Sequence, residues 1–331
     1  MLEELSAKVR SGEINPIDLV NESLRRIEVA RPLNAVVAVY ADEARSLATS
    51  HPRTGALAGL PFLVKDMARV KGHVTTSGSM LYADGVVDEV DDSVVSRLRE
   101  AGAIIIGRSN SPEFGATAYT TNKVYGPTRN PWNTEKSPGG SSGGSSAALA
   151  AGLTPLATTS DGGGSVRGPA SSTGLVGYKP SMGAIGRNVL PRWIDFSTQG
   201  KSGHSVADVA YEAAITHGPA VGDFLGLPAQ SIALNSVMPR RVLACRTFRT
   251  DVDPDIEANY ESMIDALVAS GVTVERVTSP SDNDTIWNWF IMSTAQLTQS
   301  LRHEEHRWNE LSDYVQAQLK FGATVTIDQY I

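Results

Sequence analysis

The sequence predicts an α/β protein with a single large mixed β-sheet that is covered by helices on both faces. Apolar runs typical of buried strands alternate with segments of helical periodicity, which is the pattern of such folds. An apolar fraction of 41% and a charged fraction of 20% are those of a globular protein. The 331 residues allow two domains or one large α/β domain, and no segment has the composition of a domain linker.

The first predicted elements are a helix and a buried strand. Asn15 and Pro16 are typical of a helix start, where an Asn side chain accepts backbone N–H bonds and proline fits the first turn. Helical spacing then links the apolar residues Ile17, Val20, Leu24 and Ile27. The apolar run at 60–64 predicts a buried strand that ends at Lys65 and Asp66.

The middle of the chain repeats this alternation. Residues 92–101 have the capping and apolar residues of a helix, and the run 103–106 predicts the next buried strand. An Ala-rich helix follows at 142–151, and a strand is expected over 153–159. A glycine ends each of the two helices, as is common at helix C-termini.

The C-terminal third predicts a second strand–helix–strand unit. Strands are expected at 241–245 and 272–277, with a helix at 254–269 between them. We expect the stripe Ile256, Tyr260, Ile264 and Leu267 to face the core. Cys245 is interpreted as a small core residue. From residue 284 to 331 the sequence is mostly helical, and Trp287, Trp289 and Phe290 either line a substrate pocket or form a helix core.

Composition excludes several classes of protein. A net charge of −7 argues against a general nucleic-acid binder, and one cysteine excludes disulfide scaffolds and thiolate metal sites. No segment approaches 18 consecutive apolar residues, so we expect neither a membrane span nor a membrane partner. The N-terminus lacks the basic start and apolar stretch of a secretory signal, which favours a cytoplasmic protein.

Two glycine- and serine-rich segments carry the most unusual chemistry of the chain. They are SPGGSSGGS at 137–145 and DGGGSVR at 161–167. The first segment opens a helix directly, which flexible linkers do not do. In a phosphate-binding P-loop a lysine would follow Gly144, but Ser145 stands there, and the pattern GxGxxG is absent from the second segment. Nucleotide binding therefore has no motif in this sequence.

The second segment is suited to acyl transfer. The side-chain-free residues Gly162, Gly163 and Gly164 lie at a strand-to-helix turn, where their N–H groups can converge on one carbonyl oxygen. The hydroxyl of Ser165 would then lie next to that oxygen. Removing one donor from such an oxyanion hole costs about 3–4 kcal/mol of transition-state stabilisation.

Ser165 needs a base, and Lys65 is the best candidate. None of the six histidines stands in a glycine-rich or strand-end context, and the pattern GxSxG is absent. Burial at the end of a strand disfavours the ammonium form of Lys65. Lowering its pKa from ~10.4 to about 7.5 takes roughly 4 kcal/mol, which a buried site can impose. The neighbouring Asp66 would favour the ammonium form, so we expect Asp66 to point away.

The sequence resembles the amidase signature family over most of its length. The resemblance rests on both serine segments and on the segments GLPFLVKD at 59–66, GRSNSPEFG at 107–115, NPWN at 130–133 and GLVGYKP at 174–180. It implies a Ser–cis-Ser–Lys triad in which Ser165 is the nucleophile, Ser141 the bridging serine after a cis peptide bond, and Lys65 the base. It also implies hydrolysis of a small-molecule carboxylic acid amide with no metal or organic cofactor. Aryl acyl amides, esters and carbamates stay open as substrates.

The same resemblance suggests supporting roles. Ser142 would hydrogen-bond Lys65 or its neighbours. Arg167 would orient Asp161 or another carbonyl of the turn, and binding of a substrate carboxylate is its less favoured role. Gly115 would line the acyl site or serve only in packing. Family members commonly carry a bulkier residue at Gly162, so three consecutive glycines are expected to make this turn more permissive.

Several alternatives stay open. We expect an amidase signature domain over residues 1–331 that lacks the family's C-terminal portion, with a catalytic core at about 59–185. The second functional hypothesis is the amidase subunit of a glutamine-dependent tRNA amidotransferase. Members of that subunit family carry a Ser-Ser-Leu-Asp-type segment where this chain has residues 196–200, and this difference disfavours the second hypothesis.

The third functional hypothesis is an inactive truncated pseudoenzyme. A homodimer is also left open.

Overall fold

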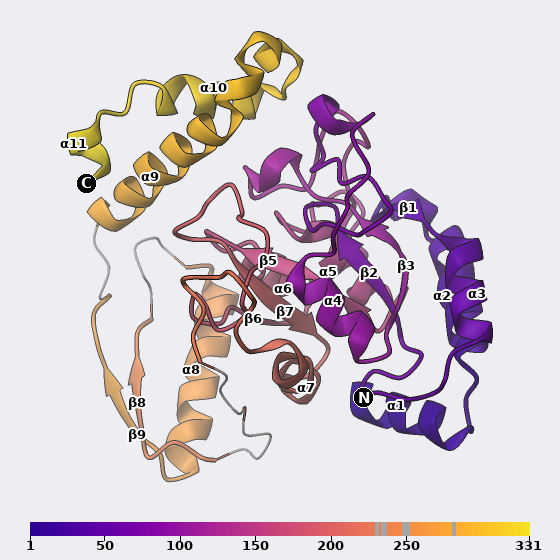
Figure 1. The fold of residues 1–331 in the computed structure, drawn as a ribbon. Coiled ribbons are helices and arrows are strands. Elements are labelled where there is room, and N and C mark those ends of the chain that lie inside the picture. Colours follow the sequence, from indigo (N-terminus) through magenta and orange to yellow (C-terminus); the bar gives the residue numbers. More distant parts are fainter. Residues whose placement is uncertain (229–231, 233–236, 247–251, 280–282) are drawn as a thin grey trace.

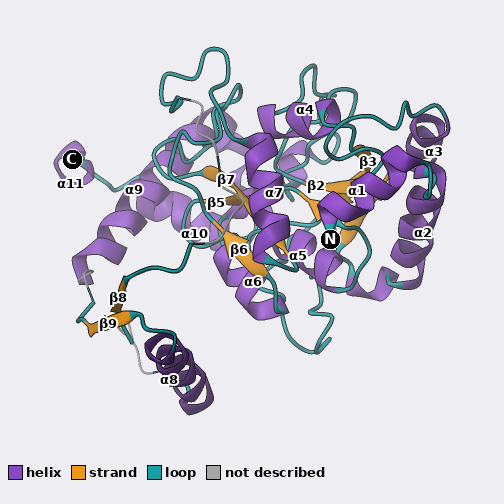
Figure 2. Ribbon diagram, turned by 90° about the horizontal axis from the view of Figure 1, so that it is seen from below, coloured by secondary structure: helices purple, strands orange, loops and turns teal. Residues whose placement is uncertain are grey.

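The structure is a computed structural model that describes residues 1–228, 232, 237–246, 252–279 and 283–331. The predicted mixed α/β fold is confirmed, and hydrogen bonding groups its described strands into three sheets (Figures 1 and 2). None of the helices in the described part of the chain has both the length and the apolar character needed to cross a lipid bilayer.

The first sheet carries the predicted buried strands. Its order is β1 (Val36–Val39), β3 (Ile104–Ser109), β2 (Pro61–Lys65) and β4 (Leu156–Ala157). Strand β2 is parallel to β3 and β4, whereas β1 is antiparallel to β3. The second sheet is antiparallel, with the order β5 (Thr159–Asp161), β7 (Thr198–Gly203) and β6 (Val176–Tyr178).

The strand expected over residues 153–159 is instead two short strands in different sheets. The Thr158 N–H still donates to the Leu63 carbonyl at 2.9 Å, which is the last backbone–backbone hydrogen bond to β2. From Thr159 onward the chain pairs with β7, where Thr159 lies opposite Gly200. The exchange of partner strands at Thr158 therefore joins the two sheets.

Alternate residues of β2 enter cores on opposite faces of the first sheet, as the two-residue period of a strand requires. Leu63 packs with α2 (Pro16–Val29), α3 (Ala41–Thr49) and α5 (Gly143–Ala150). Phe62 and Val64 pack with α1 (Leu2–Ser11), α4 (Ser93–Glu100) and α7 (Val206–Thr216) on the other face. Helices thus cover both faces of this sheet, as predicted.

Helix α2 starts where the sequence predicts, but not by the expected cap. Asn15 is its N-cap residue, yet its side chain makes no capping hydrogen bond. The Asn15 carbonyl accepts from the Asp18 N–H at 3.0 Å instead. The shorter helices are α6 (Arg167–Thr173), η1 (Arg31–Leu33), η2 (Met80–Tyr82) and η3 (Glu113–Gly115).

A small peripheral unit holds the predicted strand–helix–strand segment (Figure 2). Strands β8 (Arg241–Ala244) and β9 (Thr273–Arg276) are parallel, and α8 (Pro254–Ala269) connects them. Only Ile264 of the expected apolar stripe is buried, and Ile256 is 61% exposed. Cys245 is half-buried rather than a core residue. This unit therefore buries fewer apolar side chains than the helical spacing of its apolar residues predicts.

The C-terminal segment is helical, as predicted. It contains α9 (Asn283–Leu301), η4 (Arg302–Glu310), α10 (Asp313–Gly322) and α11 (Ile327–Tyr330). Its apolar side chains, among them Leu297 and Val315, form a third core with Leu81 and Phe114. The C-terminal helices are thereby packed against the loops that follow β2 and β3.

Candidate active site

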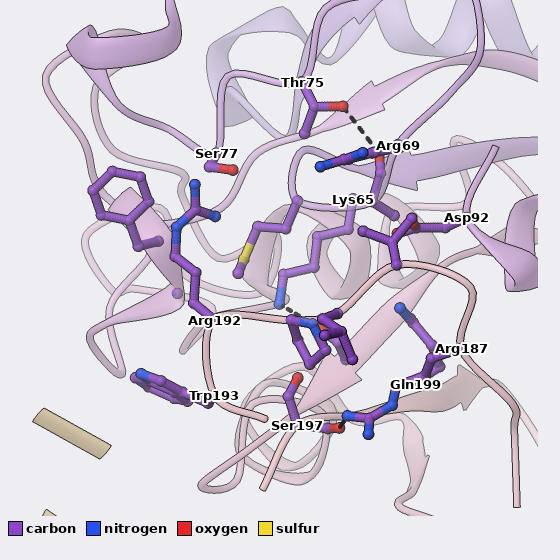
Figure 3. A pocket seen from close by; sticks show the side chains of 18 of the residues that line it. Lys65, Arg69, Thr75, Ser77, Asp92, Arg187, Arg192, Trp193, Ser197 and Gln199 are labelled. Carbon is purple, nitrogen blue, oxygen red and sulfur yellow. Dashed lines mark hydrogen bonds between the residues drawn. The ribbon is translucent and has the colours of Figure 1, made fainter. Parts of the chain in front are cut away.

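A cavity of about 540 Å³ opens at the C-terminal end of β2. Lys65 extends into it, with Arg192 and Trp193 on one side and Arg187 on the other (Figure 3). Its lining includes every residue of the expected triad, together with Gly115, Ser160 and Gly162. The two serine segments, far apart from β2 in the sequence, therefore meet at one cavity.

Lys65 is the last residue of β2 and is only 2% exposed. Its Nζ lies 2.8 Å from Ser141 Oγ, 3.0 Å from Ser142 Oγ and 3.0 Å from Ser160 Oγ. Its backbone N–H donates to Thr158 Oγ1 at 2.8 Å, which fixes the strand end. Three hydroxyl groups therefore surround the amine.

Burial lowers the pKa of Lys65 to about 7, and the negative charge of Asp161 opposes this shift. Asp66 points away, as expected. Its carboxylate accepts from the Thr76 hydroxyl and the Gly78 N–H and lies 3.7 Å from Arg108 Nη1. About half of the amine is therefore neutral at pH 7.

The loop before α5 delivers Ser141 and Ser142 to Lys65. The Gly140–Ser141 peptide bond is cis, as the resemblance implies. Close approach explains the glycines that follow, because a Cβ on Gly143 would lie 2.2 Å from Thr120 Oγ1. At Gly144 it would lie 2.4 Å from a backbone nitrogen. The glycines of this segment permit tight packing of a helix start rather than flexibility.

Asp161 organises the second segment. Its buried carboxylate accepts from Arg167 Nη2 at 2.9 Å, Arg167 Nε at 3.0 Å, the Gly164 N–H at 2.7 Å and the Val166 N–H at 3.1 Å. Although burial raises it, these donors hold the pKa of Asp161 below its usual value. The Gly164 amide is thus engaged, whereas the amides of Gly162, Gly163 and Ser165 make no hydrogen bond among the described residues. Two of the three glycine amides expected to bind an oxyanion are therefore unengaged among the described residues, as is the adjacent Ser165 amide.

Ser165 lies in the same cavity and is 9% exposed. Its carbonyl accepts from the Ser142 N–H at 3.1 Å, which ties the two serine segments together. Among the described residues, no hydrogen bond joins its hydroxyl to Ser141. Catalytic hydrogen bonds commonly tighten only when substrate is bound.

Gly115 has a close neighbour in the site. A Cβ at this position would lie 3.2 Å from Ser141 Oγ and 2.9 Å from Met67 Cε, so no side chain fits here without displacement. The described residues contain no group of three His, Cys, Asp or Glu side chains that could ligate a metal.

Sequence reasoning missed Ser160 and Trp193. Ser160 immediately precedes Asp161 on β5, so its position beside a proposed site residue was the available signal. Trp193 lies in a segment without periodicity, and nothing in the sequence indicates that its ring faces Gly162.

Comparisons with known proteins agree on one family. A family model described as Amidase matches residues 18–326. A glutamyl-tRNA(Gln) amidotransferase subunit of Synechococcus sp. is 34% identical over 310 residues, covering 89% of this chain. An acylamidase of Rhodococcus erythropolis is 32% identical over 329 residues, covering 94% of this chain. The chain spans 63% of the length of the first relative and 69% of the second.

The fold has a similar solved structure. A bacterial aryl acylamidase, described as belonging to the amidase signature family, superimposes with a TM-score of 0.88 and 28% identity. The match covers 98% of this chain and 72% of the other. The similarity thus extends over nearly the whole chain in three dimensions.

Proposed function

The chain belongs to the amidase signature family, and from this premise we propose that it hydrolyses a carboxylic acid amide through a seryl acyl-enzyme. The observation that carries the proposal is the buried amine of Lys65, held 2.8 Å from Ser141 Oγ in the cavity that Ser165 lines. An amine with a pKa near 7 is neutral in a large fraction of the molecules at neutral pH, and the neutral form can accept a proton from a hydroxyl.

Hydrogen-bond counting supports Ser141 as the group that donates to Lys65. A neutral amine has two hydrogens and one lone pair, so one of its three hydroxyl neighbours must donate to it. Ser142 Oγ already donates to the Ser160 carbonyl at 3.2 Å. Of the other two neighbours, Ser141 has the shorter contact, 2.8 Å against 3.0 Å for Ser160.

The proposed reaction transfers protons through two hydroxyls. Lys65 takes the proton of Ser141, which takes that of Ser165 as Ser165 Oγ attacks the amide carbon. The free amides of the Gly162–Ser165 turn hold the oxyanion. The tetrahedral intermediate collapses, the C–N bond breaks, and Ser141 returns a proton to the leaving amine. Water then attacks the acyl-enzyme by the same route and releases the acid.

A serine-directed phosphonylating reagent tests this assignment. We expect labelling at Ser165, located by mass spectrometry of peptides, and its loss in Lys65→Ala, because a neutral base must activate the serine. The exposed Ser171→Ala provides a control that should be labelled like the wild type. Labelling of Ser145, or no labelling of the wild type, would contradict the proposed triad.

The amidotransferase subunit is the second candidate, because the relative in Synechococcus sp. is one. Release of ammonia from glutamine only in the presence of partner subunits would favour it. Turnover of acyl amides by the isolated chain would favour a stand-alone amidase and exclude a pseudoenzyme. A panel of aryl acyl amides, esters and carbamates would define the substrate class.

A further inference from the structure

The reactive turn is in contact with a helix that lies far away in the sequence. Trp289 of α9 donates its Nε1–H to the Gly162 carbonyl at 2.9 Å, across 127 residues. Gly162 follows β5 and is the first of the three consecutive glycines. The hydrogen bond therefore acts on the peptide unit that joins Gly162 to Gly163.

The orientation of that peptide unit decides which group faces a substrate. The Gly162 carbonyl and the Gly163 N–H belong to one plane, and in a trans peptide they point in opposite directions. The Gly140–Ser141 bond is the cis peptide of the described chain, so this one is trans. By holding the carbonyl, Trp289 directs the Gly163 N–H away from the indole.

Glycines on both sides make this constraint necessary. A peptide between two glycines can rotate at little steric cost, because neither Cβ opposes the change. A rotated unit would place a carbonyl oxygen where an oxyanion needs a donor, and the two would repel each other.

Two indole rings enclose the glycines. A Cβ on Gly163 would lie 2.4 Å from Trp289 Cζ2, and one on Gly162 would lie 2.8 Å from Trp193 Cε3. The two rings meet edge to face with their centroids 5.9 Å apart. Space that a side chain on the turn would fill is thus occupied by tryptophans from other segments. This packing limits the permissiveness expected of three consecutive glycines.

We propose that Trp289 is a positioning residue, whose indole N–H keeps the Gly163 amide available for the oxyanion. This inference rests on the proposed amidase function. Because the oxyanion exists only in the tetrahedral intermediates and the flanking transition states, the hydrogen bond affects kcat more than substrate binding.

The decisive variant removes only the N–H group. Replacing Trp289 with 3-benzothienylalanine keeps the bicyclic shape and puts sulfur where the N–H stands. Loss of one oxyanion donor lowers kcat by about 100- to 1000-fold, and partial misorientation of that donor is expected to lower it about 10- to 100-fold, with KM within threefold. Trp289→Phe should likewise lower kcat while leaving KM nearly unchanged, and it should also cause a larger loss of stability.

Trp287→Phe is the matched control. Trp287 lies on the same helix but packs against Phe290 and Phe321, with ring centroids 5.8 Å and 5.6 Å away. We expect its kcat and KM to remain those of the wild type. A trifluoromethyl ketone inhibitor, which forms a tetrahedral oxyanion with the nucleophile, should bind the benzothienylalanine variant more weakly by the same factor as the fall in kcat/KM.

The outcomes separate this inference from the function on which it rests. An unchanged kcat in the benzothienylalanine variant would overturn the positioning role while leaving the amidase function in place. A raised KM with unchanged kcat would also overturn it, and would make Trp289 a wall of the substrate pocket. A wild-type protein without amide turnover and without labelling of Ser165 would reject the function, and the inference with it.

Discussion

Lys65 shows how a single buried side chain can acquire the properties of a base. Three hydroxyls surround the amine, and in the described part of the chain no carboxylate contacts it directly, so burial outweighs the more distant Asp161. A carboxylate in direct contact would stabilise the ammonium form and remove the basic lone pair. Asp66, which follows Lys65 in the chain, is directed instead to Thr76 and Arg108.

The first prediction concerns the pH dependence of activity. Because only neutral Lys65 can accept the serine proton, kcat/KM should fall about tenfold per pH unit below pH 7 and be constant above it. The measurement is an initial-rate profile from pH 5 to pH 9 with an uncharged amide. A rate that is constant down to pH 5 would show that Lys65 is not the base.

A second prediction concerns stability. The pKa of Lys65 is about 7 in the folded protein against 10.5 ordinarily, so between these values the unfolded chain binds more protons. The unfolding free energy contributed by Lys65 therefore rises with pH, by about 2–3 kcal/mol between pH 6 and pH 9. Lys65→Met removes this contribution, so its stability relative to wild type should be highest at pH 6 and decline toward pH 9.

Urea denaturation at several pH values measures this difference. The exposed Lys71→Met is the control and should track the wild type at every pH. A constant difference between Lys65→Met and wild type across the range would mean that the amine titrates normally.

At the scale of elements, one carboxylate connects a short helix to α10. Glu113 of η3 is fully buried. Its Oε1 accepts from the Ser79 hydroxyl at 2.6 Å and its Oε2 from the Ser312 N–H at 2.6 Å. Ser312 is the N-cap residue of α10, so the side chain of Glu113 satisfies a backbone donor at a helix start.

The third prediction is that Glu113→Gln lowers the stability of the protein and increases local opening of α10. An amide has one acceptor oxygen where the carboxylate has two, so one buried donor loses its partner at a cost of about 1–3 kcal/mol. We expect a lower urea midpoint and faster hydrogen exchange over residues 313–322. The exposed Glu135→Gln should change neither. Unaltered hydrogen exchange in α10 would show that the apolar contacts of the third core are sufficient to stabilise this helix.

Local patterns predicted most of the elements. Helix α4 and strand β3 follow from capping residues and apolar runs, and the site residues Lys65 and Ser165 stand in local motifs. The break at Thr158 could not be predicted, because it is set by pairing with β7, which is some forty residues later. The same reason hides Ser160 and Trp193, whose roles arise from contacts between distant segments.

At the scale of the whole molecule, several separate regions build the cavity. The loop at 187–197 contributes Arg187 and Arg192, and neither guanidinium group forms an ion pair among the described residues, although the Arg187 backbone N–H donates to the Asp223 carboxylate at 2.7 Å. The Arg192 guanidinium lies 4.6 Å from the centroid of the Phe114 ring. Arg69, by contrast, has Asp88 at 3.8 Å. Two guanidinium groups without an ion pair among the described residues therefore line the cavity, one on each side of Lys65.

The fourth prediction concerns substrate charge. An amide that bears a carboxylate should have kcat/KM about tenfold above a matched amide that bears an ammonium group, because unpaired arginines attract the anion. Arg192→Gln should reduce this ratio several-fold, whereas the exposed Arg129→Gln should leave it intact. A ratio near one in the wild type would contradict the prediction.

The separation of 127 residues between Gly162 and its indole partner has a consequence for synthesis in the cell. At 5–20 residues per second, a ribosome needs about 6–25 s to add the residues between them. Until then the nascent polypeptide already contains both serine segments and the lysine, but the partner of the Gly162 carbonyl has not yet been translated. If Trp289 positions the turn as proposed, the oxyanion site is complete only after α9 has been synthesised.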